Sequence, residues 1–113
     1  MQPKLFEVSS KIVPIEDVLL YALGDFQSRG KVLANRELAF DRLRGAFLRA
    51  FAKFGIAELP EAQIVAGLRS LGANVVEVPN YVAKRPFRVT VDTEMGRRAS
   101  ALFKERQDLQ SRQ

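Results

Sequence analysis

The residue types that most often carry out catalysis are scarce in this chain of 113 residues. It contains no histidine and no cysteine, which excludes Ser-His-Asp and Cys-His catalytic groups and the usual zinc sites. Proton transfer would then depend on carboxylates, lysine, tyrosine or a bound metal ion. The carboxylates are scattered and match no metal-binding loop: Glu16, Asp17, Asp41, Glu58, Glu61 and Glu77. We therefore expect neither an enzyme nor a protein that holds a metal or another cofactor.

Positive charge gathers in one short segment between two strand-like runs. Lys84 and Arg85 are adjacent, Arg88 lies on the run that follows, and Tyr81 precedes them. Cations in this arrangement can clamp phosphate groups, and the tyrosine can stack or donate a hydrogen bond to a phosphate. The alternative is that these charges keep an exposed turn hydrated and protect a strand edge from pairing.

A second set of cations lies on the predicted helix at residues 35–54. Arg42, Arg49 and Lys53 are spaced by seven and then four residues, so they form a stripe opposite the apolar face of that helix. A stripe of this kind can follow a nucleic-acid backbone. It is also what the solvated face of an ordinary amphipathic helix looks like.

The bulk composition describes one small domain with a basic surplus. The net charge of +5 favours anionic partners such as nucleic acid. We expect a single domain over residues 1–113, with residues 1–14 as an extended arm and residues 110–113 as a frayed tail. No apolar run approaches the ~20 residues that span a bilayer, so we expect no membrane partner. The absence of cysteine favours a cytoplasmic location.

Apolar residues recur at helical spacing in the first half of the chain. One helix follows Pro14 and ends at Gly24 or Gly30. A longer helix is expected over residues 35–54, with Asn35 as its N-cap and Gly55 as its C-cap. Its apolar stripe predicts the centre of the core: Phe40, Leu43, Phe47, Phe51 and Phe54.

The residue pattern in the second half of the chain predicts a helix, a hairpin and a last helix. The third helix starts near Pro60 and stops at Gly72. We expect Ile64, Leu68 and Leu71 on its buried side and Val65 at the margin. Residues 74–78 and 87–91 are β-branched and partly alternating, which is typical of two strands of a hairpin. Thr93 is expected to cap the last helix. The predicted fold class is α+β and mostly helical.

This order of three helices, a hairpin and a final helix resembles the winged-helix class of DNA-binding domains over roughly residues 15–103. The resemblance rests on the order of elements. It implies that the helix at residues 60–71 lies in the major groove and that residues 80–85 form the wing. Gln63 and Arg69 are then on the side of that helix which faces the bases.

The last helix carries an apolar seam with cations beside it. The seam consists of Met95, Ala99, Leu102 and Leu109, a spacing that would let two copies pair. Alternatively, the helix packs back on its own domain. We expect a homodimer to which this helix contributes.

The sequence thus predicts a small protein that binds double-stranded DNA, such as a transcriptional regulator, through a basic hairpin tip and one helix. The alternative is a non-catalytic module that binds another protein chain through a helix face or a sheet edge. The placement of the cations distinguishes the two functions. Cations on one surface favour DNA, and scattered cations favour the interaction module.

Overall fold

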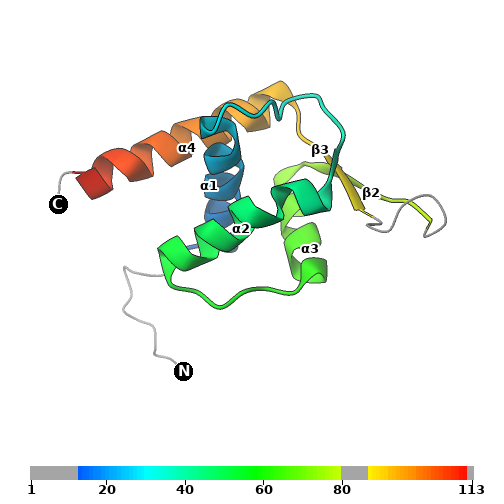
Figure 1. Cartoon of the computed structure of the whole chain (residues 1–113), viewed down its shortest axis with the longest axis horizontal. Coiled ribbons are helices and arrows are strands. Elements are labelled where there is room, and N and C mark those ends of the chain that lie inside the picture. The colour runs from blue at the N-terminus through cyan, green and yellow to red at the C-terminus, as the bar shows by residue number, and fades with distance from the viewer. Residues whose placement is uncertain (1–12, 80–86, 112–113) are drawn as a thin grey trace.

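The computed structural model describes residues 13–79 and 87–111, and within them the chain forms four helices and three short strands (Figure 1). The predicted class, α+β and mostly helical, is confirmed. The predicted order of elements is wrong at one place, because a short strand lies between the first two helices. The elements are α1 (Ile15–Ser28), β1 (Leu38–Ala39), α2 (Phe40–Phe54), α3 (Glu61–Leu71), β2 (Asn74–Glu77), β3 (Phe87–Thr90) and α4 (Thr93–Ser111).

The additional strand explains why the helix expected from Asn35 begins five residues later. Leu38 and Ala39 pair with Val89 and Arg88 of β3, so this stretch is extended and cannot be helical. Asn35 itself has a φ of 60°, a conformation that asparagine tolerates better than most residues. Its backbone N–H donates to the Val91 carbonyl at 2.7 Å. Asn35 is therefore a link to the end of β3 and not the N-cap of α2.

The sheet is antiparallel with β3 in the centre, in the order β1-β3-β2. In the hairpin, Val75 pairs with Val89 and Glu77 pairs with Phe87. Both strands thus lie close to their expected positions. The helix that follows is capped by Asp92 and not by Thr93, because the Asp92 carboxylate accepts a hydrogen bond from the Met95 N–H at 2.8 Å. Thr93 is the first residue of α4.

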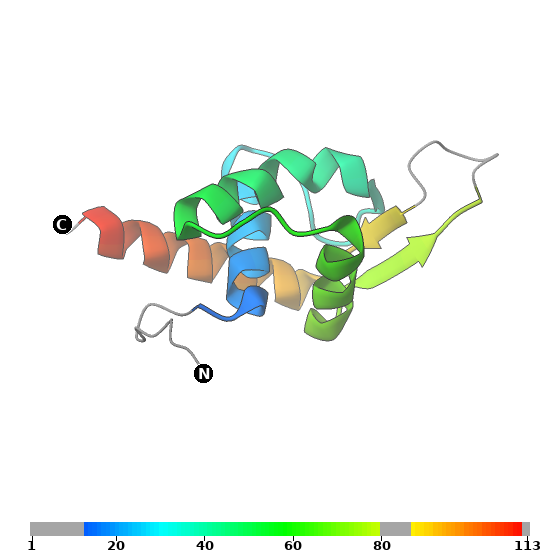
Figure 2. The ribbon, with the colours of Figure 1, turned by 90° about the horizontal axis from the view of Figure 1, so that it is seen from below.

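Helix α1 lies between α2 and α4 and also contacts α3 (Figures 1 and 2). The helix runs through Gly24 and ends at Ser28. A Cβ atom at Gly24 would overlap the carbonyl oxygen of Ala99 and would lie 2.5 Å from the Cβ of Phe103. The glycine therefore permits a close approach of the α1 and α4 backbones.

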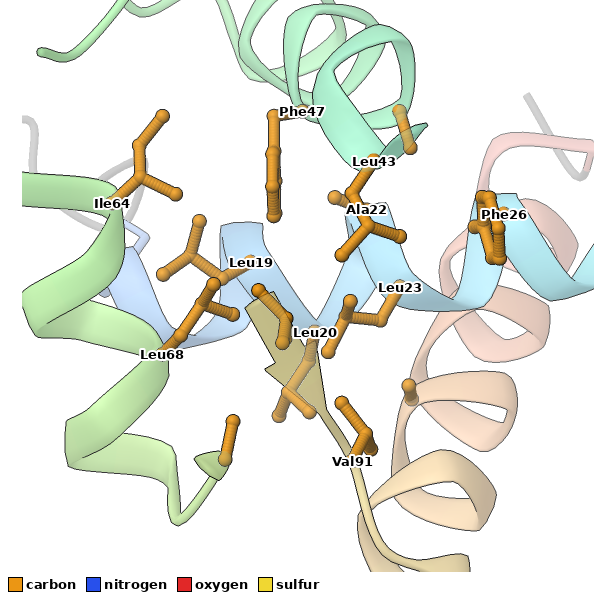
Figure 3. Packing of buried hydrophobic residues seen from close by; sticks show 14 of the residues in the cluster. Leu19, Leu20, Ala22, Leu23, Phe26, Leu43, Phe47, Ile64, Leu68 and Val91 are labelled. Carbon is orange, nitrogen blue, oxygen red and sulfur yellow. The ribbon is translucent and has the colours of Figure 1, made fainter. Parts of the chain in front are cut away.

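The predicted phenylalanine stripe forms the α2 side of the core. Phe40, Leu43, Phe47 and Phe51 are buried, and Phe54 is partly buried. Figure 3 shows Leu43 and Phe47 pointing toward Leu19, Ala22 and Leu23 of α1. Gly55 ends α2 with a φ of 67°, as expected of a C-cap glycine.

Helix α3 keeps its predicted bounds but is rotated slightly from its predicted orientation. Pro60 precedes it and Gly72 caps it with a φ of 106°. Val65 is buried, whereas Leu71 is only half-buried, so the two exchange the roles that we expected. Among residues 13–79 and 87–111, no helix combines the length and the apolar character needed to cross a bilayer.

Candidate nucleic-acid interface

Helix α3 and the β2–β3 hairpin lie at the same end of the molecule (Figure 1). Only Gly72 and Ala73 separate the end of α3 from the start of β2. One side chain also joins them, since the Arg69 guanidinium donates a hydrogen bond to the Val75 carbonyl at 2.9 Å. The predicted recognition helix and the described strands of the hairpin are therefore neighbours.

The outer face of α3 carries few groups that could read a base. Ile64, Val65 and Leu68 point into the core. The exposed residues are small or uncharged apart from one cation: Ala62, Gln63, Ala66, Arg69 and Ser70. Part of the hydrogen-bonding capacity of Arg69 is used on Val75. This leaves Gln63 as the exposed amide of the helix.

The cations of α2 do not form one free stripe. Arg49 reaches Asp25 of α1, with its Nη2 2.6 Å from the carboxylate Oδ2. The ammonium of Lys53 lies 5.4 Å from the centroid of the Tyr21 ring, close enough for a cation–π interaction. Arg42, near the start of α2, is exposed. Two of the three predicted contacts are thus occupied by side chains of α1.

Asp25 is the buried carboxylate with which Arg49 pairs. Its side chain is 9% exposed, and it also pairs with Arg29 at 3.3 Å. Our interpretation of the sequence did not single it out. Its signal is a lone carboxylate in an otherwise apolar stretch of α1, four residues before an arginine. Such a carboxylate needs a cationic partner when it is buried.

Tyr21 joins three helices on the same side of α1. Its ring packs edge-on against Phe54 of α2 and at a tilt against Phe103 of α4. Its hydroxyl accepts a hydrogen bond from Gln107 at 2.8 Å. Burial raises the pKa of Tyr21, and the negative charge of Asp25 adds to the rise, while the Gln107 hydrogen bond lowers it.

The remaining predicted contacts belong to the hairpin. Arg88 is half-buried on the central strand, where it pairs with Ala39 on one side and Val76 on the other. Tyr81, Lys84 and Arg85 lie outside the residues that the structure describes. Among the predicted contacts, Arg49 and Lys53 therefore lie against α1, whereas Arg69 lies beside β2.

An apolar groove of about 600 Å³ runs along the outer face of α3. Its walls come from three segments. The start of α1 contributes Ile15 and Glu16, and the α2–α3 connection contributes Ile56, Ala57 and Leu59. From α3 come Gln63, Ala66, Gly67 and Ser70. The face that carries Gln63 is therefore also one wall of a groove, which the sequence pattern did not reveal.

Most of the apolar seam of α4 that the structure describes packs against the core of the same chain. Met95 and Ala99 are buried, and Leu102 and Phe103 are partly buried against the core. The side chain of Leu109 lies outside the described ones. In the described part of the chain, no three acidic side chains come together in a way that could hold a metal ion.

Comparisons of the chain with protein-family models, with curated proteins and with solved structures find no match.

Proposed function

We propose that this protein is a winged-helix domain that binds double-stranded DNA through α3 and the β2–β3 hairpin. The observation that carries the proposal is the adjacency of these two elements, joined by the hydrogen bond from Arg69 to Val75. A helix and a hairpin presented together can engage a groove and the neighbouring backbone at the same time. The net charge of +5 supports an anionic partner.

The outer face of α3 indicates how such a complex would form. Base recognition uses paired donors and acceptors, and this face offers mainly Gln63 and the unused donors of Arg69. Most of the affinity would therefore come from phosphate contacts, which position a protein but do not specify a sequence. We assign these contacts to Lys84, Arg85, Arg88 and Arg42. Arg49 and Lys53 are left out because α1 already engages them.

Fluorescence anisotropy with a labelled duplex of random sequence tests this function. We expect binding at tens of micromolar protein in about 50 mM salt, and a steep loss of affinity as salt is added. The absence of any binding at that salt concentration would end the proposal.

A second candidate function is a module that binds another protein chain. The apolar groove along α3 favours it, because concave sites lined mainly by apolar side chains are typical of binding sites. So does the placement of Arg49 and Lys53, which removes them from a shared basic surface. Failure to bind DNA, with the groove still intact, would leave this candidate.

We also propose that two copies pair through α4. Leu102 and Phe103 are only partly buried within one chain, so they retain apolar surface for a partner. Light scattering at tens of micromolar protein tests this proposal. A monomeric mass would contradict it.

A further inference from the structure

The groove along α3 is an apolar surface that the described residues leave open. Ile56 is 39% exposed in its wall, and Ile15 and Leu59 are only half-buried. Single exposed apolar side chains are common on protein surfaces. A contiguous group of them in a concave site is typical of a surface that binds an apolar ligand or segment.

The chain enters the described structure at the edge of this groove. Val13 is partly buried and packs against the core. Ile15, two residues later, is already part of the groove wall. Any occupant supplied by residues 1–12 would therefore start beside the groove and would not have to cross the molecule.

Residues 1–12 have the composition and the length to fill the groove. They include four apolar side chains in a short span: Leu5, Phe6, Val8 and Ile12. An extended chain advances ~3.3 Å per residue, so the seven steps from Val13 back to Phe6 reach roughly 23 Å. Ile15 already lies in the groove wall, so this reach begins at the edge of the groove. The segment is thus long enough for Phe6 to lie in the groove.

We propose that the groove binds residues 5–8 of the same chain, with Phe6 as the main apolar contact. A covalently attached segment has a high effective concentration at a neighbouring site, which favours it over a segment of another molecule. Glu16 lines the groove, and Lys4 and Lys11 flank residues 5–8 in the sequence, so these flanking charges are complementary to that of Glu16.

Occupation of the groove would also cover the exposed face of α3, because Gln63, Ala66 and Ser70 belong to both surfaces. This consequence rests on the proposed DNA-binding function. A bound segment would then compete with DNA for α3, and a variant that weakens the segment would bind DNA more tightly.

The protein contains no tryptophan, so a Phe6→Trp variant places a single reporter in the segment. We expect its emission to be blue-shifted and weakly quenched by acrylamide. Adding Ala66→Asp, which puts a charge into the groove wall, should shift the emission to the red and increase quenching several-fold. Adding Ala62→Asp is the matched control, since Ala62 is exposed on α3 one turn away and outside the groove lining. It should change neither.

Solvent-like emission from the introduced tryptophan that Ala66→Asp does not change would overturn the proposal. So would a blue shift that disappears on dilution, because the segment would then belong to a second copy. DNA affinity is measured separately with Phe6→Ser, which should bind the random duplex several-fold more tightly. If no variant binds DNA, the proposed function fails, while the fluorescence result still decides the groove proposal.

Discussion

Arg49 of α2 and Asp25 of α1 form the main polar link between these two helices, with Nη2 and Nε of the arginine both 2.6 Å from the same carboxylate oxygen. The Asp25 side chain is 9% exposed and the Arg49 side chain 42% exposed. The pair thus stands at the edge of the core. Its first role is to hold α1 and α2 together.

Loss of Arg49 should therefore destabilise the protein. Arg49→Ala leaves Asp25 buried with the more distant Arg29 as its remaining cationic partner in the described structure. Because Arg49 is partly hydrated and Arg29 remains, we expect a loss of about 1–3 kcal/mol and not the full cost of an unpaired buried charge. Urea unfolding measures the loss. Arg42→Ala is the control, an exposed arginine on the same helix, and should stay within about 0.5 kcal/mol of the parent. Equal midpoints for both variants would contradict this role.

The Asp25–Arg49 pair could not be predicted from the spacing of residues in the sequence. Helical spacing predicted that Arg49 lies opposite the phenylalanines, and in isolation that face would be solvated. Spacing within one helix does not say which other helix lies beside it. The position of α1 is set by close packing, including the glycine contact with α4, and it brings Asp25 to Arg49.

The elements that were predicted well depend on signals within one segment of the chain, whereas β1 depends on a contact with a distant segment. The bounds of α3 follow from local signals, a proline before its first turn and a glycine at its end. The phenylalanine stripe of α2 is also local, because one helix face is defined by one segment. Strand β1 has two residues and exists because it pairs with β3, about fifty residues later. The groove likewise needs three separate segments to meet.

The phenol of Tyr21 should make stability depend on pH in the alkaline range. Burial raises its pKa in the folded state above the ordinary value of 10.0. The folded protein then binds more protons than the unfolded chain above that value, so the free energy of unfolding falls as pH rises. This contribution is fully present below pH 10.0 and is lost as pH rises through the raised pKa.

Comparison with Tyr21→Phe isolates this effect from other groups. At about pH 8 the parent should be more stable by about 0.5–1.5 kcal/mol, because the variant lacks the Gln107 hydrogen bond. That advantage should shrink in urea titrations carried out progressively above pH 10.0. A constant difference across the range would show that Tyr21 ionises equally easily in both states.

Gly24 should tolerate no side chain. In Gly24→Ala the new methyl group overlaps the Ala99 carbonyl oxygen, so the α1 and α4 backbones must separate, at a cost of about 1–3 kcal/mol or more. Thermal unfolding should show a clearly lower Tm. Gly45→Ala in α2 is the matched control, because its Cβ would meet only the end of the Arg49 side chain, at 3.2 Å. It should stay within about 1 kcal/mol of the parent, because the exposed arginine end has to move by only a few tenths of an ångström. A parent-like Tm for Gly24→Ala would mean that α4 does not pack on α1 as described.

The contribution of the hairpin cations to DNA binding should appear in the salt dependence of affinity. Each phosphate contact that is lost flattens the plot of log affinity against log salt by about 0.9. Lys84→Ala combined with Arg85→Ala should therefore lower the slope by about one to two units. Stability should stay within about 0.5 kcal/mol of the parent, because these are changes to charged residues of a connecting segment. Lys31→Ala combined with Lys104→Ala removes the same charge from two exposed positions outside α3 and the hairpin and should leave the slope nearly unchanged. An equal fall in slope for both double variants would show that net charge, and not the hairpin, attracts the duplex.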